Sequence, residues 1–236
     1  MSDKSRLLLI AARLLYAAAA ALLTVTVLYL VLHLPVFKLR EIQISGPLEY
    51  VTAQQLQFIM TQELRGNFFS VDLNRLRTAL EKLPWVRKVQ LRKRWPDRLE
   101  AILEEHRVLA RWGDGKLVNT HGELFNAAFS RELPLFLGPP GSEQEVAQWY
   151  GTFRQLLAPL KRFPERVTLT PRRAWELQLD NGVKLALGRE KMDARLAKLT
   201  SVYTFSLRKY GDAIAYIDLR YPNGFAVKLT AQGASG

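Results

Sequence analysis

The sequence contains no cysteine and only three histidines among 236 residues. The absence of cysteine excludes a disulfide scaffold and any metal site built on thiolates. His33, His106 and His121 each lack a second ligand-type residue one helical turn away, which disfavours a metal centre. No glycine-rich phosphate loop is present, and Glu104 and Glu105 face opposite sides of an expected strand instead of converging on one bond. We therefore expect no cofactor and no small-molecule substrate.

One short pattern keeps an enzyme hypothesis open. Ser206 and Lys209 match the S-x-x-K motif of penicillin-binding enzymes. The Ser-Asp-Asn and Lys-Thr-Gly motifs that accompany it in those enzymes do not follow. Because a pattern with two fixed positions arises easily by chance, we expect a protein that acts by binding and is not an enzyme.

Charge is absent from the nineteen residues between Leu14 and Leu32, most of which are aliphatic or alanine. At about 1.5 Å of rise per residue, this run nearly spans a hydrocarbon core of roughly 30 Å. We expect a transmembrane helix over 14–34 behind a cytoplasmic tail at 1–13. A cleaved signal peptide is the alternative, with a small-residue cleavage site at Ala17–Ala21. Such cleavage would leave a strongly apolar new N-terminus.

Charges flanking the span give its direction only weakly. Lys4, Arg6 and Arg13 precede it, and Lys38 and Arg40 follow it, so the positive-inside bias is small. A dozen residues on one side and some two hundred on the other favour a C-terminal bulk that lies outside the cytoplasm.

The chain carries a formal net charge of +12, and +10 of it lies beyond residue 34. A basic folded region indicates anionic partners. The densest basic stretch is an expected strand on which Lys88, Arg92 and Arg94 share one face, while Val89 and Trp95 lie on the other. This basic face is either simply solvated or a contact for anionic lipid or an acidic protein segment. We expect no nucleic-acid partner, because Trp95 is assigned to the buried side and the region to the outside of the cytoplasm.

After the span, period-two and helical patterns predict a β-α-α-β-β unit over 36–106. Val36–Ser45 alternates as a strand and stops at Gly46–Pro47. Thr52 with Gln55 forms a capping box for the first helix, and Asp72 can cap the second. Two further strands are expected at 85–95 and 99–105.

The remaining region, 107–230, mixes short strands with two amphipathic helices and ends in a tail at 231–236. Ser142 and Glu145 form a capping-box pattern before a regular apolar helical face. Asp180–Asn181–Gly182 is a strong hairpin-turn signal. The expected strands are 108–112, 116–119, 123–125, 175–179, 183–187, 213–220 and 225–229, and a second helix begins near Met192. The fold class is therefore α+β.

Six motifs in order resemble the FtsQ/DivIB family, in particular its Gram-negative FtsQ branch. They are Phe37–Gly46 directly after the span, Leu83–Val86, Arg92–Asp97, Ala110–Trp112 followed by Gly122–Phe125, Arg172–Trp175, and Asp218–Tyr221. The resemblance covers nearly the whole chain. It implies a POTRA domain over 36–106 and a mostly antiparallel β-domain with packed helices over 107–230. It also implies a single-pass protein of the bacterial inner membrane at the division septum, with a cytoplasmic N-terminus and a periplasmic C-terminal bulk.

The resemblance further implies a non-enzymatic scaffold of the division apparatus. Members of the family bind the FtsB–FtsL pair, which couples them to septal peptidoglycan synthesis by FtsW and FtsI. In the family, FtsB adds a strand to the edge of the last β-strand, where unpaired backbone groups are available to a partner.

The stretch that matches this edge here runs from Arg220 to Val227. Arg173 and Arg220 match family arginines that pair with acidic residues of FtsB. Tyr221 matches an aromatic docking residue, and Gly224 a position of close backbone approach. The other residues assigned to the edge are Asn223, Phe225, Ala226 and Val227.

The sequence departs from the family pattern at two positions of this edge. Pro222 lacks an N–H group and so removes one possible ladder bond. Leu229 replaces a family aromatic residue, which shifts apolar docking toward Phe225.

A POTRA-like unit also suggests a receptor of outer-membrane assembly. Such receptors carry a large β-barrel after their POTRA repeats. This chain has one unit, a helical anchor and too few residues for such a barrel.

Overall fold

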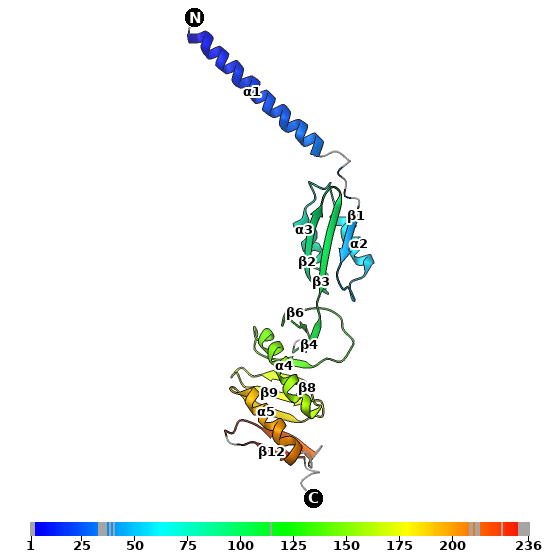
Figure 1. The fold of residues 1–236 in the computed structure, drawn as a ribbon, viewed down its shortest axis with the longest axis vertical. Coiled ribbons are helices and arrows are strands. Elements are labelled where there is room, and N and C mark those ends of the chain that lie inside the picture. Colours follow the sequence, from blue (N-terminus) through cyan, green and yellow to red (C-terminus); the bar gives the residue numbers. More distant parts are fainter. Residues whose placement is uncertain are drawn as a thin grey trace. The chain divides into compact units, whose positions relative to one another are not determined.

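The computed structural model describes residues 3–32, 37, 39, 41–113, 115–207, 210, 213–222 and 224–230. The chain divides into two compact units, Met1–Glu105 and His106–Gly236 (Figure 1). Each unit is described by itself.

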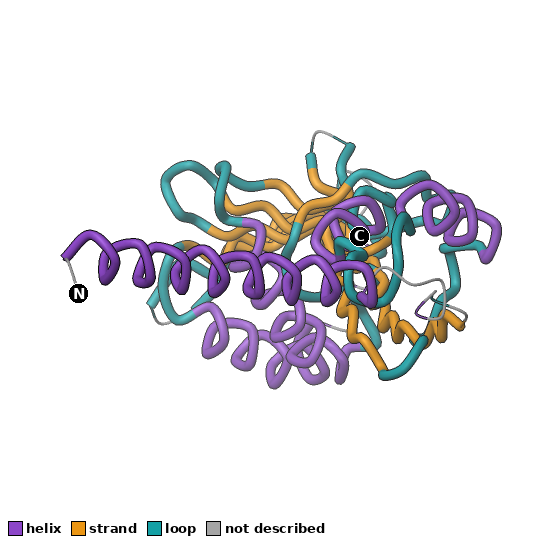
Figure 2. Tube along the Cα trace, turned by 90° about the horizontal axis from the view of Figure 1, so that it is seen from above, coloured by secondary structure: helices purple, strands orange, loops and turns teal. Residues whose placement is uncertain are grey.

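Helix α1 spans Asp3–Leu32 without a break (Figure 2). Its segment Ile10–Val31 has a mean hydropathy of 2.2 over 22 residues, and none of it is buried against the rest of the chain. At about 1.5 Å per residue this segment is long enough to cross a hydrocarbon core. The hydroxyls of Thr24 and Thr26 donate to the carbonyls of Ala20 and Leu22, at 2.9 and 2.8 Å, so their polar atoms are satisfied within the helix. By length and composition, α1 qualifies as a membrane span.

The rest of the first unit is the predicted β-α-α-β-β arrangement. Its elements are β1 (Glu41–Ser45), α2 (Ala53–Glu63), α3 (Leu73–Leu80), β2 (Val86–Arg94) and β3 (Arg98–Glu105). The strand order is β1-β3-β2, with β1 parallel and β2 antiparallel to β3. Both predicted caps are confirmed: Thr52 and Gln55 form a reciprocal capping box, and Asp72 accepts from the backbone N–H groups of Asn74 and Arg75.

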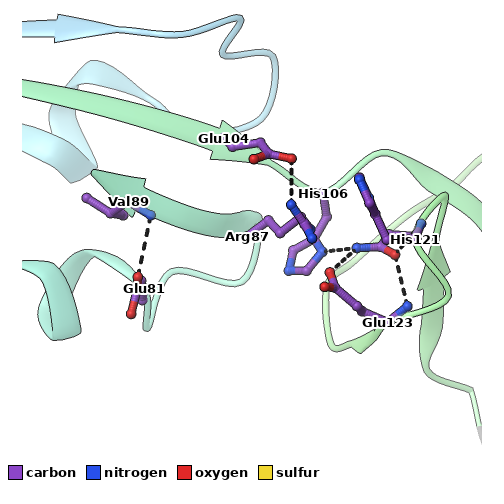
Figure 3. A network of polar contacts seen from close by, with 8 residues as sticks. Glu81, Arg87, Val89, Glu104, His106, His121 and Glu123 are labelled. Atoms are coloured by element: carbon purple, nitrogen blue, oxygen red, sulfur yellow. Dashed lines mark hydrogen bonds and ion pairs between the residues drawn. The ribbon is translucent and has the colours of Figure 1, made fainter. Parts of the chain in front are cut away.

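The buried carboxylate of Glu105, at the end of β3, binds the backbone of the segment that precedes α2. Glu105 is 8% exposed. Its two oxygens accept hydrogen bonds from the backbone N–H groups of Glu49, Tyr50 and Val51, at distances between 2.7 and 3.2 Å. Glu104 beside it is exposed and pairs with Arg87 at 2.8 Å instead (Figure 3). The strand alternation therefore gives two adjacent glutamates opposite structural roles.

The second unit contains a nine-stranded mixed sheet in the order β12-β11-β10-β9-β8-β7-β4-β5-β6. Five of its eight pairings are antiparallel and three are parallel. Its strands are β4 (Val108–Trp112), β5 (Leu117–Asn119), β6 (Leu124–Phe125), β7 (Leu135–Leu137), β8 (Pro164–Leu169), β9 (Trp175–Leu179), β10 (Lys184–Gly188), β11 (Ile214–Asp218) and β12 (Ala226–Leu229). The α+β architecture is confirmed, whereas β7 and β8 lack a signal among the predicted strands.

Two helices, α4 (Glu143–Leu157) and α5 (Met192–Val202), cover this sheet with their apolar faces. A 3₁₀ turn, Ala158–Leu160, follows α4, and a π-helical turn, Tyr203–Leu207, follows α5. Phe153 is fully buried and meets the Trp175 ring edge-on, with 5.5 Å between centroids. Such contacts between α4 and β9 fix the helix on the sheet and hold the strand ends in register.

Asn119 organises the hairpin between β5 and β6 of the second unit. This side chain is fully buried, and its amide nitrogen lies 2.9 Å from His106 and 2.6 Å from Glu123. Its amide oxygen accepts from the backbone N–H groups of His121 and Glu123 (Figure 3). The His106 ring stacks on Phe125 at 4.1 Å. Because every polar atom is used, the buried amide specifies one turn conformation between β5 and β6.

Two sequence predictions are wrong. Ser142 begins α4, but its side chain makes no cap bond; its hydroxyl donates to the carbonyl of Pro139 at 2.6 Å instead. The rigid loop before the helix offers that nearer acceptor. Trp95 is 76% exposed and not on the buried side. The reason is that β2 ends at Arg94, so the strand alternation does not extend to Trp95 in the turn.

Candidate functional site

The outermost strand of the second sheet, β12, pairs with β11 on one side only. Among the described residues, no strand occupies its other side. Val227 and Leu229 lie half-buried against the core of this unit, whereas Ala226 and Lys228 are exposed. A strand in this position has backbone N–H and C=O groups that point away from the sheet and are available to a partner.

The residues that lead into β12 form a bend. Pro222 lies in this bend and β12 begins only at Ala226, so the missing N–H of Pro222 does not interrupt the strand. Phe225 packs partly against the core. A Cβ atom placed on Gly224 would meet no described heavy atom within 4 Å, so the approach to this position is open. The predicted site residue Asn223 lies outside the described residues.

Arg220 is held at the end of β11 by Asp218. Its backbone N–H and its Nε donate to one Asp218 oxygen at 3.0 and 2.8 Å, and its Nη2 donates to the other at 2.6 Å. The Asp218 side chain is 9% exposed and that of Arg220 is 60% exposed. The pair therefore fixes an exposed guanidinium at the surface, with Nε and Nη2 engaged by Asp218.

Arg195 of α5 ties the neighbouring strand ends together. Its guanidinium donates to the carbonyl of Leu187 and, at 3.4 Å, to the carbonyl of Arg220. Gly188 makes room for this arrangement with a φ of +80°, since a Cβ atom there would lie 2.6 Å from Nη1 of Arg195 and 3.3 Å from Cγ of Arg220. A side chain at position 188 would thus displace the residues that set the Arg220 backbone.

Arg173 occupies the tight turn between β8 and β9 and has a φ of +65°. Its N–H donates to the carbonyl of Thr170 at 2.8 Å. Its Nη2 lies 2.7 and 2.6 Å from the two carboxylate oxygens of Glu145 on α4. A non-glycine residue with positive φ is uncommon, so the turn holds Arg173 in a costly backbone conformation at the surface.

The sheet register places the two arginines at the same end of neighbouring strands. Trp175, two residues after Arg173, pairs with Gly188. Gly188 in turn lies beside Arg220. The ends of β9, β10 and β11 therefore place Arg173 and Arg220 at the same end of the sheet, and Arg220 directly precedes the approach to β12, where Tyr221 is 57% exposed. The result is a positively charged corner beside an available strand edge.

Two residues to which the sequence analysis gave no role support this corner. Asp218 stands in a family motif, and an acid two residues before an arginine is a local signal for an ion pair. Arg195 has no local signal in the sequence, because its contact with the strand ends depends on how α5 packs.

Removing the Asp218 carboxylate should make the free energy of unfolding depend less on pH in the acidic range. The hydrogen bond from Arg220 lowers the pKa of Asp218 below its ordinary value of 3.8, against the opposing effect of burial. The folded state thus binds this proton less readily than the unfolded chain, so the stabilisation is complete above pH 3.8 and is lost as the pH falls through the lowered pKa. We expect Asp218→Asn to be less stable at pH 6 and to lose less stability than the wild type between pH 4 and pH 2.

Thermal unfolding at a series of pH values measures this effect. Asp193→Asn, which removes an exposed carboxylate of α5, is the matched control. A pH profile of Asp218→Asn that parallels both the wild type and this control would contradict the assignment.

The predicted basic face of the first unit lies on β2. Lys88, Arg92 and Arg94 are all exposed there. Arg94 donates to Glu100 at 3.2 Å, and this exposed ion pair leaves the face strongly positive.

Of the two residues behind the enzyme hypothesis, only Ser206 lies in the part of the chain that the structure describes. Ser206 is exposed in the π-helical turn, and Lys209 lies outside the described residues. In the described parts of the chain, no group of three or more His, Cys, Asp or Glu residues could hold a metal ion.

Comparison with known proteins agrees with this two-unit architecture. Residues 37–106 match the POTRA domain, FtsQ-type, and residues 110–220 match cell division protein FtsQ/DivIB, C-terminal. Cell division protein FtsQ of Burkholderia pseudomallei is 41% identical over 235 residues, which cover 97% of this chain and 94% of that protein. FtsQ of Nitrosospira multiformis is 41% identical over 204 residues, covering 84% and 86%. FtsQ of Neisseria meningitidis serogroup B is 35% identical over 202 residues, covering 85% of each chain. With both halves matched in order behind one apolar helix, the chain belongs to the FtsQ/DivIB family of cell division proteins.

Proposed function

We propose that this protein is a non-enzymatic scaffold that binds the FtsB–FtsL subcomplex through the outer edge of β12. The single observation that carries the proposal is the available edge of β12 beside the corner formed by Arg173 and Arg220. A strand of the partner would add to this edge through main-chain hydrogen bonds, and the corner would orient it.

Half-buried and exposed side chains alternate along β12, and this pattern is compatible with the addition of a strand at its edge. Val227 and Leu229 already pack, half-buried, against the core, so a strand laid alongside extends an existing apolar layer. Ala226 and Lys228 face outward, where Ala226 leaves room for a side chain of the added strand. Tyr221, more than half exposed before the strand, supplies an aromatic surface for an apolar residue of the partner.

The two arginines would select an acidic partner. Asp218 engages Nε and Nη2 of Arg220, and Glu145 engages Nη2 of Arg173. Each guanidinium keeps further N–H donors for a second carboxylate. Because their own acids already fix their positions, both arginines offer these donors with little loss of side-chain freedom on binding.

The membrane placement follows from the same family reading. We assign residues 1–13 to the cytoplasm, 14–34 to the inner-membrane span, 36–106 to a periplasmic POTRA domain, 107–230 to the β-domain and 231–236 to a tail. At the septum, the scaffold would couple FtsB–FtsL to peptidoglycan synthesis by FtsW and FtsI. The exposed face of Lys88, Arg92 and Arg94 would contact anionic headgroups or an acidic protein segment. The role requires no cofactor, nucleic acid or small-molecule substrate.

Tyr221→Ala should weaken capture of a purified FtsB–FtsL complex by at least about tenfold, or about 1.4 kcal/mol. The reason is that the substitution removes an exposed aromatic ring from the approach to β12 without touching the core. Affinity is measured by biolayer interferometry with the full chain in lipid nanodiscs.

Phe163→Ala is the matched control, because Phe163 is 51% exposed and precedes β8 at the end of the strand away from Arg173. We expect this variant to bind as the wild type does. Equal affinities for the wild type, Tyr221→Ala and Phe163→Ala would rule out the proposed docking residue.

A further inference from the structure

The three-stranded sheet of the first unit has two edges of opposite character. β2 forms one edge, and five of its nine residues are Arg or Lys. β1 forms the other, with the sequence Glu-Ile-Gln-Ile-Ser and no Lys, Arg or Pro. Charged residues and proline are the usual devices that protect a strand edge from pairing with another chain. The β2 edge carries this protection along its length, whereas β1 carries only Glu41 at its first position, so its other four residues form an unprotected edge.

An apolar groove of about 460 Å³ lies directly beside the unprotected edge. Ile42 and Ile44 of β1 line one side of it with Leu48, and Leu56 and Met60 of α2 line the other. Figure 1 shows β1 at the margin of the sheet next to α2. Ile44 is 40% exposed although it is a large aliphatic residue on a strand. Among the described residues that line the groove, Gln57 is the only polar one.

The backbone of β1 is also available on this side. β1 pairs with β3 in parallel over all five residues, from Glu41↔Arg98 to Ser45↔Ile102. Within the described part of the chain, no strand pairs with the opposite side of β1. Its outward N–H and C=O groups therefore provide a ladder of about five residues, and a fourth strand would lie roughly 4.8 Å away, over the groove.

We propose that the groove between β1 and α2 is a second docking site, which takes an extended, uncharged segment of a partner protein as a fourth strand. Successive side chains of a strand alternate between its two faces. Every second residue of the added segment would therefore lie beside Ile42 and Ile44, above Leu56 and Met60, and must be apolar. The residues between would lie beside Gln43 and Ser45, which are exposed, and must be polar.

The charge pattern favours this partner over others. None of the described residues that line the groove is ionised, so a charged segment would lose hydration beside them without a counter-charge. The exposed Glu41 already pairs with Arg98 at 2.9 Å. A second copy of this chain could pair its own β1 here with two-fold symmetry only in antiparallel fashion. That pairing would direct the two membrane-anchoring segments toward opposite ends of one short ladder.

A synthetic probe tests this site with the full chain in nanodiscs of zwitterionic phospholipid. The probe is a fluorescent, end-capped peptide of seven residues in which valine alternates with glutamine. The control peptide has the same sequence with an N-methyl group on every backbone amide, which removes the hydrogen-bond donors of both its edges. We expect saturable binding of the first peptide only, together with slower amide hydrogen exchange at residues 41–45.

Variants of both walls of the groove locate the binding. Ile44→Lys places a charge on the edge, and Ala53→Trp fills the groove from an exposed position at the start of α2. We expect each to weaken binding at least tenfold. Phe58→Lys is the control, because Phe58 is 64% exposed on α2 and does not line the groove.

Equal binding by the wild type and Ile44→Lys, binding of the methylated peptide, or unchanged exchange in β1 would overturn the proposal. A dimer of the chain that Ile44→Lys dissociates, without any peptide binding, would overturn it as well, since the occupant would then be a second copy. None of these outcomes bears on the β12 edge, which is tested with FtsB–FtsL.

Discussion

Replacement of Glu105 by alanine should destabilise the first unit by about 3–5 kcal/mol, the loss expected when a buried, fully bonded charge is removed. The carboxylate is the acceptor for three backbone N–H groups, those of Glu49, Tyr50 and Val51. Alanine leaves these donors without a partner at the point where the chain enters α2. Since a domain of this size has only about 5–15 kcal/mol of stability, we expect partial or complete unfolding of the β-α-α-β-β unit.

Glu104→Ala is the control, because it removes the neighbouring glutamate but only an exposed ion pair with Arg87. We expect it to cost at most about 1 kcal/mol. Glu105→Gln, which keeps one acceptor oxygen, should fall between the two. The two units need separate observation, so the measurement is urea unfolding followed by amide exchange of residues 41–105. Equal losses for Glu104→Ala and Glu105→Ala would contradict the role given to Glu105.

Charge reversal at Arg220 should weaken capture of FtsB–FtsL by at least about 30-fold, or about 2 kcal/mol. Arg220→Glu removes the guanidinium donors proposed to meet an acidic residue of the partner. It also places a carboxylate beside Asp218, whose oxygens now lie 2.8 and 2.6 Å from the guanidinium. The variant would therefore both reverse the charge and, through this repulsion, displace the segment that leads into β12.

A second variant separates the two effects. Arg220→Gln removes the charge without adding repulsion, and we expect it to weaken capture by at least about tenfold. Arg166→Glu changes the net charge as much as Arg220→Glu does, at an exposed position in the middle of β8. Circular dichroism checks that each variant is folded. If Arg166→Glu and Arg220→Glu lose affinity equally, the effect is one of net charge and not of a site.

Local signals in the sequence were sufficient for the first unit. The reciprocal bonds of Thr52 and Gln55 and the cap at Asp72 involve residues at most three positions apart. Alternation in β3 also gave the opposite orientation of Glu104 and Glu105. The alternation did not predict the structural role of Glu105, because the backbone groups that it binds lie more than fifty residues earlier in the chain.

The second unit was harder to predict because its contacts are less local. β7 has only three residues and pairs in parallel with β4 and β8. The sequence therefore has neither a hairpin turn nor a long alternation of apolar and polar residues that would predict this strand. The resemblance supplied Arg173 and Arg220. The acids that fix them are of two kinds: Asp218 is a neighbour in sequence, whereas Glu145 lies 28 residues from Arg173. Packing alone brings Glu145 and Arg195 to the site.

The central claim, that FtsB–FtsL adds a strand to β12, is tested most directly by amide hydrogen exchange of the full chain with and without the purified complex. We expect the complex to slow exchange at residues 226–229. Exchange at β6, the strand at the other end of the same sheet, should not change. Tight binding of FtsB–FtsL with no added protection in β12 would contradict the account.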